Sequence, residues 1–393
     1  MTKTTRNSTA ATEEAFHRHY AAIWGKERWH QSLYPALAEP TRYAALVNGY
    51  ADIEDFWKAI DEAEIPRDEL TELHCPSFRP NSQASSDTDM ENAITNDLSV
   101  ASGIVCFART TTEMSPSCQP FPTPKAYGQH PAKLMTHWNL DAASALAASL
   151  LDIKPGDAVL DLCAAPGGKS VTLSQNLFPS HYAAHSDADT VSLGGYEATG
   201  RLVSNEANGR RQKRLAENLR DYIPPQLLKA GYVQCTNVDG TSASASALAA
   251  GKGGYEKVLV DAPCSSERHI IHAHLKARAN GGSAPEMTNW RSGSSKRLAE
   301  IQTKLLMTAL KAVKIGGRVI YATCSIENLE NDGVVEKTLH EVAKERKKGG
   351  IKWDEELEGW AERTKYGWIV LPDHPRKGKW GPLYFAMIKR VGP

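Results

Sequence analysis

Residues 157–170 read DAVLDLCAAPGGKS, a short apolar run that leads through a loop of small residues into a helical stretch at 168–177. After it, β-rich runs and helical stretches alternate along the chain. The expected strands are 157–162, 201–205, 232–238, 257–261 and 317–323, and the later helices are expected at 208–222, 294–313 and 328–344. Such alternation is typical of a parallel sheet with helices on both faces. With an edge hairpin at 368–371 and 384–388, we predict an α/β fold built on a doubly wound, mostly parallel seven-stranded sheet.

Composition divides the rest of the chain into two further parts. Residues 1–73 show a helical pattern of apolar residues among acids, which predicts a small helical N-terminal region. Residues 74–131 are rich in Pro and Ser and are expected to form a linker, with one strand at 103–107. The α/β domain is then expected at 132–393. Loop-like insertions are expected within it at 180–200, 241–254 and 277–294.

Composition also excludes several classes of protein. The chain has 393 residues, of which 41% are apolar, and seven cysteines without a C-x-x-C pair. This length and apolar content suit a globular protein and not a disordered one. No run of 18 apolar residues and no apolar segment near Met1 is present in the sequence, so neither a membrane span nor secretion is expected. The cysteine spacing predicts neither a disulfide framework nor a metal site.

Charge is unevenly distributed, although the 46 basic and 46 acidic residues cancel. Residues 1–100 hold 9 basic and 17 acidic side chains, a net charge of −8, and the remainder carries +8. Residues 257–318 contain 11 Lys and Arg against 4 Asp and Glu. This excess suits a polyanionic partner, and the solvated helix face of an ordinary enzyme is the alternative.

The residues after each expected strand are candidates for a ligand site, because doubly wound sheets bind ligands beyond the carboxyl ends of their strands. The first loop has paired glycines but lacks the G-x-G-x-x-G and P-loop spacings, which disfavours a pyrophosphate ligand. Glu206 follows the second strand and suits the hydroxyls of a ribose, and Asp239 follows the third and suits a purine amine. A helix cap at Glu206 and an Asp-Gly turn at Asp239 are the alternatives. Together these residues indicate a nucleoside ligand.

Two cysteines follow the fourth and fifth strands, in DAPCSS at 261–266 and TCS at 323–325. For each cysteine taken alone, the alternative to a reactive thiol is an inert residue packed in the core. Because both cysteines are expected at the same edge of the sheet, reactive thiols are favoured. Cys324 also precedes the helix expected at 328–344, whose positive N-terminal end is expected to lower the pKa of the thiol.

The motifs DLCAAPGGKS, DAPCSS and TCS occur in the order of the cofactor loop and the two cysteine motifs of a known family. Residues 130–393 resemble the Sun-domain (nucleolar protein/Sun) family of S-adenosylmethionine-dependent RNA cytosine-5 methyltransferases. The sequence is most similar to the mitochondrial ribosomal-RNA branch in SSERH at 265–269, WGPLYF at 380–385 and YAALVN at 43–48. The resemblance implies a Rossmann-like methyltransferase fold and S-adenosylmethionine as the cofactor.

The resemblance also assigns roles by position in the motifs. It implies that Cys324 adds to C6 of cytosine, that Cys264 assists product release, and that Asp261 and Lys169 stabilise the adduct. From the residues alone, the two cysteines cannot be ranked. The residues implied to surround the cofactor are Cys163, Ala164, Ala165, Pro166, Gly167, Gly168, Lys169, Glu206, Arg211, Asp239, Gly240 and Asp261. No metal is expected.

The substrate implied by the resemblance is RNA, with ribosomal RNA favoured and 5-methylcytosine as the product. A tRNA cytosine-5 methyltransferase and a non-catalytic RNA-binding ribosome-assembly factor are the alternatives. The absent G-x-G-x-x-G spacing and the paired cysteines disfavour a nicotinamide-dependent oxidoreductase, and only the resemblance disfavours a DNA methyltransferase. The cytosine has to be unpaired or flipped, because C6 is attacked from above the ring. The expected phosphate partners are Arg268, Lys276, Arg278, Arg291, Lys296 and Arg297.

The expected protein partner and cellular compartment both follow from the resemblance to the mitochondrial ribosomal-RNA branch. It implies a separate protein partner that supplies RNA specificity, since the acidic N-terminal region would repel phosphate. It also implies a mitochondrial location, with cytoplasmic and nucleolar locations as the alternatives. Residues 1–12 are rich in Ser and Thr and contain no acid, as at the start of a transit peptide, but Glu13 and Glu14 follow.

Overall fold

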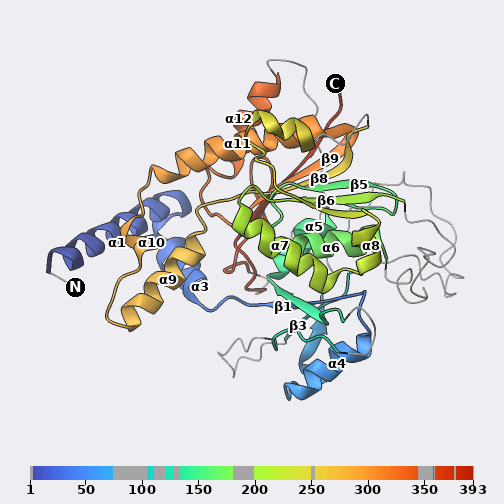
Figure 1. The fold of residues 1–393 in the computed structure, drawn as a ribbon. Coiled ribbons are helices and arrows are strands. Elements are labelled where there is room, and N and C mark those ends of the chain that lie inside the picture. Colours follow the sequence, from blue (N-terminus) through green and yellow to red (C-terminus); the bar gives the residue numbers. More distant parts are fainter. Residues whose placement is uncertain are drawn as a thin grey trace, which may run out of the picture.

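The structure of the chain is a computed structural model. It describes residues 3–73, 104–109, 121–127, 133–179, 199–248, 253–343, 357, 359–375 and 378–392. The sheet order is β10-β11-β12-β9-β8-β5-β6-β7 (Figure 1). Strands β7, β6, β5, β8 and β9 pair in parallel, and β12, β11 and β10 continue the sheet antiparallel beyond β9. The strands are β5 (Ala158–Asp161), β6 (Arg201–Asn205), β7 (Val233–Thr236), β8 (Tyr255–Asp261), β9 (Val313–Thr323), β10 (Glu362–Arg363), β11 (Trp368–Val370) and β12 (Leu383–Lys389).

The predicted doubly wound sheet is confirmed, but the number of strands was wrong. Among the described residues, the main sheet has eight strands instead of seven, because β10 adds a two-residue edge strand that is too short to give a sequence pattern. The predicted hairpin is present as β11 and β12. However, β12 lies inside the sheet, since it pairs along six residues with β9.

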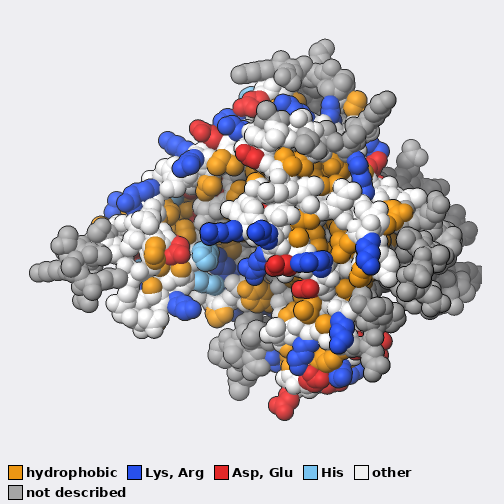
Figure 2. Space-filling model, in the orientation of Figure 1, with side chains coloured by type: hydrophobic (Ala, Val, Ile, Leu, Met, Phe, Trp, Pro, Cys, Tyr) orange, Lys and Arg blue, Asp and Glu red, His pale blue; other side chains and the backbone are white. Residues whose placement is uncertain are grey.

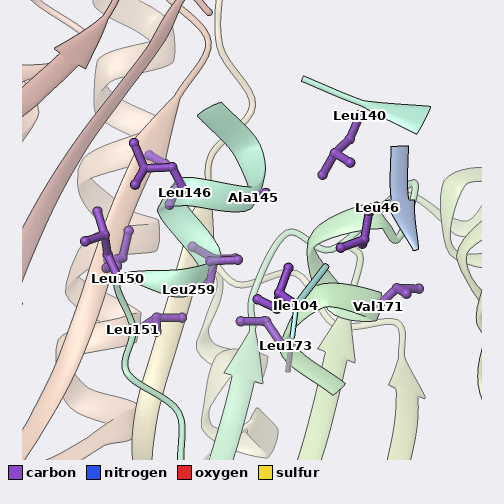
Figure 3. Close-up of a cluster of buried hydrophobic side chains, with 14 of the residues drawn as sticks. Leu46, Ile104, Leu140, Ala145, Leu146, Leu150, Leu151, Val171, Leu173 and Leu259 are labelled. Atoms are coloured by element: carbon purple, nitrogen blue, oxygen red, sulfur yellow. The ribbon is translucent and has the colours of Figure 1, made fainter. Parts of the chain in front are cut away.

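Helices cover both faces of this sheet and bury a separate core on each (Figure 1). One core contains α5 (Ala142–Ser149), α6 (Gly168–Leu177) and α7 (Gly209–Tyr222), which α8 (Pro225–Lys229) follows. Figure 3 shows part of it, with Leu146 of α5, Leu173 of α6 and Leu259 of β8 among the labelled side chains. The other core contains α11 (Ser294–Ala312) and α12 (Asp332–Ala343). Burial on both faces explains why the central strands are continuous apolar runs.

The N-terminal region contains helices, as expected, and also strands that were not expected. Its helical elements are α1 (Lys3–Trp24), α2 (Lys26–Arg28), η1 (Trp29–Leu33), α3 (Tyr34–Ala38), α4 (Ile53–Glu62) and η2 (Arg67–Glu69). An antiparallel sheet of order β2-β3-β1-β4 contains β1 (Ala44–Val47), β2 (Leu70–Glu72), β3 (Cys106–Arg109) and β4 (His137–Leu140). All four residues of β1 are buried, so the strand shows no alternation that would distinguish it from a helix.

The strand expected at 103–107 within the predicted linker 74–131 is present as β3, displaced toward the C-terminus and paired on both edges. Two of the predicted loop-like insertions, however, contain helices. The insertion expected at 277–294 is partly helical, since α9 (Glu267–Ala279) enters it and α10 (Pro285–Thr288) lies within it. In the insertion at 241–254, a short 3-10 helix, η4 (Ala243–Leu248), is present. Residues 180–198 of the first insertion lie outside the described residues.

In the part of the chain that the structure describes, no helix is long and apolar enough to span a bilayer. The same residues contain no cluster of three or more His, Cys, Asp or Glu side chains arranged to hold a metal ion.

Arg268 joins three segments in the interior and does not face a substrate. Its guanidinium donates hydrogen bonds to the backbone carbonyls of Gly381, Glu39 and Pro40, and the residue is 8% exposed. The prediction that Arg268 contacts a phosphate was therefore wrong. Sequence cannot reveal this, because the acceptors are main-chain atoms more than 100 residues away.

We expect Arg268→Ala to destabilise the protein by about 3 kcal/mol, because it leaves three carbonyl groups without their charged donor. Chemical denaturation followed by circular dichroism measures the loss. Arg297 is an exposed residue of α11, and Arg297→Ala is the matched control, expected to change stability by less than about 0.5 kcal/mol. Equal small effects of the two substitutions would contradict the structural role of Arg268.

Candidate active site

The carboxyl ends of four parallel strands bring the predicted site residues to one edge of the sheet. Strands β5, β6, β8 and β9 end at Asp161, Asn205, Asp261 and Thr323. The loop 163–169, Glu206, Cys264 and Cys324 follow these ends directly. Asp239 follows β7 at the same edge.

Two sulfur atoms lie in direct contact at this edge. Cys324 Sγ is 3.1 Å from Cys264 Sγ and 3.1 Å from Ser266 Oγ. Cys324 is exposed and Cys264 is half-buried. Ser266 has a φ of 53°, which is left-handed backbone that a non-glycine residue rarely adopts. This conformation is held at the N-cap of α9, where the serine hydroxyl lies within 3.4 Å of both sulfurs.

The contact makes the two thiols electrostatically unequal. The hydrogen bond from Cys264 lowers the pKa of Cys324, with a further contribution from Ser266, although desolvation opposes both. The same hydrogen bond, together with burial, raises the pKa of Cys264 well above its ordinary value. Cys324 is therefore the group that ionises first, and Cys264 stays a thiol that donates to it.

The prediction that the helix after Cys324 lowers the pKa of its thiol was wrong. Helix α12 begins at Asp332 and not at 328, so Cys324 is eight residues before it. The neighbouring helix N-cap is instead Ser266 of α9, which is close in space and distant in sequence.

Lys169 and Asp261 form an ion pair beside the cysteine loops. The distance from Lys169 Nζ to Asp261 Oδ2 is 2.8 Å, and Nζ also donates to Ser144 Oγ at 3.1 Å. Burial alone would lower the pKa of Lys169, but the Asp261 carboxylate raises it. The ammonium group is thus charged and held at the end of β8.

Glu206 offers a buried acceptor at the end of β6. Its Oε1 accepts from the Asn208 backbone N–H at 2.9 Å, and its Oε2 has no hydrogen-bond donor among the described residues. Arg211 Nη1 lies 3.4 Å from this second oxygen, and Arg211 Nη2 donates to the Ala165 carbonyl. The cap of α7 is the Asn208 side chain, so capping does not explain Glu206. A buried carboxylate oxygen of this kind fits the hydroxyl groups of a ribose.

Asp239 and the glycines of the site have structural explanations as well. Asp239 is exposed, and its Oδ1 accepts from the N–H and the hydroxyl of Thr241, as in the turn that was the alternative. A Cβ on Gly168 would lie 2.7 Å from Trp138 Nε1, and one on Gly240 would lie 2.9 Å from Leu305 Cδ2. Close packing therefore requires these two glycines whether or not a ligand approaches them.

Several polar residues around the cysteines were not predicted as site residues. Ser266 touches both sulfurs and is the last residue of the DAPCSS motif at 261–266, so its place in that motif was the only signal. Ser144 lies on α5, in the stretch DAAS at 141–144 that also fits the family pattern. Glu330 precedes α12, and no sequence pattern connects it to the site. Burial, with the nearby Glu267 charge, raises the pKa of Glu330 to about 7.

Comparison with known proteins places the chain in a family. Residues 183–386 match the sequence model of the family described as 16S rRNA methyltransferase RsmB/F. The chain belongs to this family. It is 30% identical over 78% of its length to the 5-cytosine rRNA methyltransferase NSUN4 of Bos taurus, covering 69% of that protein. The corresponding mouse protein is 28% identical over 92% of this chain, and 84% of it is covered.

A second group of relatives is named for a different RNA. The chain is 32% identical over 67% of its length to the mitochondrial tRNA (cytosine(34)-C(5))-methyltransferase of Danio rerio, and it spans 63% of that protein. Among solved structures, NSun6 from Pyrococcus horikoshii, crystallised with SFG, superposes with a TM-score of 0.55 at 18% identity, covering 96% of this chain and 98% of that one. This likeness confirms the Rossmann-like methyltransferase fold.

We expect iodoacetamide to alkylate Cys324 with a pH midpoint below the value of about 8.5 of an ordinary thiol, because the thiolate is the reacting form. Cys235 is the internal control, since burial raises its pKa. Ser266→Ala removes a hydrogen-bond donor and is expected to shift the Cys324 midpoint upward. Peptide mass spectrometry after timed alkylation measures both sites. Identical titration of Cys324 and Cys235 would show that the thiolate assignment is wrong.

Proposed function

We propose that this protein is an S-adenosylmethionine-dependent RNA (cytosine-5-)-methyltransferase that forms 5-methylcytosine through a transient Cys324 adduct. The observation that supports it most directly is the exposed Cys324 sulfur, with its lowered pKa, beside a second thiol at the ligand-binding edge of the sheet. A non-catalytic assembly factor would not need this arrangement.

Two cysteines suit the reaction because C5 of cytosine is a poor nucleophile until another group adds to C6. The Cys324 thiolate forms an S–C6 bond, and the ring electrons shift toward C5 and N3. C5 then takes the methyl group, loses its proton, and the S–C6 bond breaks to restore the aromatic ring and the thiolate.

The contact between Cys264 and Cys324 also suits Cys264 to the elimination step. Before the adduct forms, this contact keeps Cys264 as a thiol. Its pKa is raised chiefly by its hydrogen bond to Cys324. Once the Cys324 sulfur is bonded to carbon, it no longer carries a negative charge. The main reason for the raised pKa of Cys264 is then gone. The Cys264 thiol can then lose its proton to solvent. As a thiolate it takes the C5 proton, and the C5–H electrons form the C5–C6 double bond while the S–C6 bond breaks and Cys324 leaves as a thiolate.

Asp261 and Lys169 are proposed to stabilise the adduct. The Asp261 carboxylate can accept hydrogen bonds from the cytosine amine and from protonated N3, where the ring electrons accumulate. Lys169 Nζ holds this carboxylate in place at 2.8 Å. The pair therefore presents an oriented charge at the end of β8.

S-adenosylmethionine supplies the methyl group as a sulfonium substituent. Glu206 is proposed to hold its ribose, because Oε2 is a buried acceptor without a donor among the described residues. Asp239 is proposed to accept from the adenine amine. The remaining residues proposed for this site are Cys163, Ala164, Ala165, Pro166, Gly167, Gly168, Lys169, Arg211, Gly240 and Asp261.

Ribosomal RNA is the proposed substrate, and transfer RNA is the second candidate. The mouse rRNA methyltransferase aligns with 92% of this chain, N-terminal region included, whereas the zebrafish tRNA enzyme aligns with 67%. Relatives named as mitochondrial enzymes support a mitochondrial location. A protein partner that supplies RNA specificity, and the division into parts 1–73, 74–131 and 132–393, are likewise proposals.

Cys324→Ala is expected to abolish methyl transfer, because no thiolate can add to C6. Cys264→Ala is expected to trap a covalent protein–RNA adduct, because elimination fails. Incubation with ribosomal RNA and S-adenosylmethionine, followed by denaturing electrophoresis, separates the two results. Methylation by Cys324→Ala would contradict the nucleophile assignment, and an adduct formed by Cys324→Ala but not by Cys264→Ala would exchange the two roles.

The RNA-facing surface that we propose differs from the basic stretch 257–318. Arg278 pairs with Glu13 at 2.9 Å, and Arg291 donates to two backbone carbonyls. Lys276, Lys296 and Arg297 are exposed. Helix α7 adds five exposed cations, and basic side chains gather across the middle of the face in Figure 2, where α7 lies in Figure 1. These five are Arg210, Arg211, Lys213, Arg214 and Arg220.

Removing Lys213 and Arg214 together is expected to weaken RNA binding and to reduce its salt dependence. Two lost contacts to single-stranded RNA would lower the slope of log affinity against log salt by about 1.4. Fluorescence anisotropy with a single-stranded RNA over a salt series measures it. Arg18→Ala on α1, where the arginine already pairs with Glu14, is the control. An unchanged slope in the double variant would exclude α7 from the RNA path.

A further inference from the structure

A buried carboxylate joins the two cysteine loops. Glu267 is fully buried, and its Oε1 accepts hydrogen bonds from the hydroxyl of Ser265 and, at 3.2 Å, from that of Ser325. Each of these serines directly follows one of the two cysteines. Glu267 Oε2 accepts from the Ile326 backbone N–H at 3.0 Å. One side chain thus holds both loops at the residues that determine where the sulfurs lie.

The N-terminal helix supplies a fourth donor to this carboxylate. Tyr20 of α1 donates its hydroxyl to Glu267 Oε1 at 2.9 Å, and Tyr20 is 1% exposed. The tyrosine ring packs between Phe16, Trp29 and Trp290, so the position of the hydroxyl is fixed. The two residues are 247 positions apart in sequence.

Two neighbouring residues of α1 contact the loop after Cys324. His19 Nε2 lies 2.6 Å from Glu327 Oε2. Trp24 Nε1 donates to the Ile326 carbonyl at 3.1 Å. Three side chains of one helix therefore bind loop residues within three positions of the cysteines.

General packing does not require this polar arrangement. The aromatic cluster around Tyr20 already attaches α1 to Trp290, which follows α10, and a buried carboxylate costs desolvation that apolar residues would avoid. Several charge-assisted hydrogen bonds to one carboxylate do, however, fix the relative positions of the groups that donate them.

We propose that Tyr20 and Glu267 are positioning residues of the methyltransferase site, and that α1 acts through them to hold the Cys264 and Cys324 sulfurs in contact. The consequence for catalysis rests on the function proposed above. The geometric part does not, since it concerns the distance between two thiols.

The test compares Tyr20→Phe with Tyr34→Phe in the full-length protein. The first removes only the hydroxyl that reaches Glu267. The second is the matched control, because Tyr34 packs against Trp29 and His17 in the same region and, among the described residues, makes no hydrogen bond to either cysteine loop. Trp24→Phe, which removes the donor to Ile326 from a half-buried position, keeps the proposal testable if Tyr20→Phe does not fold.

The first measurement is the affinity for phenylarsine oxide, which bonds to two adjacent thiols with release of water. A Cys264→Ser variant gives the background from other cysteines. We expect Tyr20→Phe to weaken the specific binding about tenfold, the effect of losing one hydrogen bond to a charged group, and Tyr34→Phe to leave it unchanged. Trp24→Phe is expected to weaken it about threefold.

The second measurement is methylation of ribosomal RNA. We expect Tyr20→Phe to lower kcat about tenfold with an unchanged KM for S-adenosylmethionine, because the proposed cofactor residues lie on other loops. Unchanged arsenical binding, or a KM that rises together with the fall in kcat, would overturn the proposal. If the wild-type protein methylates no RNA, the proposed function fails, while the arsenical comparison still decides the positioning of the thiols.

Discussion

The register between β8 and β9 is the constraint on which the site depends. Asp261 of β8 pairs in parallel with Ala322 of β9. Cys264 follows the first of these residues by three positions, and Cys324 follows the second by two. A slip of one residue would displace one loop by about 3.3 Å and reverse the facing of every side chain in the strand, so the two sulfurs would lose contact. Burial of both faces of these strands makes such a slip costly.

Ionisation of one thiol depends on how the nearby acids are neutralised. Asp261 and Glu267 both raise the pKa of Cys324, so unpaired carboxylates would oppose the thiolate. Lys169 pairs with Asp261, and four hydrogen-bond donors surround Glu267. The direct hydrogen bonds from Cys264 and Ser266 then outweigh the remaining repulsion. The site therefore combines a reactive sulfur with the acids that bind the base and hold the loops.

Sequence was sufficient for the parts of the molecule that depend on local pattern. Helix α6 has the predicted bounds 168–177, and the five parallel strands were all expected, because long apolar runs and alternating elements determine them. Strand β1 was missed, since four consecutive buried residues show no period. The Tyr20–Glu267 contact and the burial of Arg268 were missed because both join segments that are distant along the chain. Patterns within one sequence do not carry such information.

The uneven charge of the chain is partly cancelled inside the molecule. Glu13 of α1 pairs with Arg278 at 2.9 Å and lies 3.3 Å from His274, both on α9. Glu39 pairs with Lys379 near the C-terminus. The acidic N-terminal region thus neutralises cations of the basic part by packing against it, and a cation count along the sequence overstates the charge left for RNA. The cations of α7 lie on the helix that begins four residues after β6, at the ligand-binding edge. A polyanion that reaches Cys324 from this side meets positive charge, whereas Glu13 of α1 remains paired with α9 and Glu14 with Arg18 of its own helix.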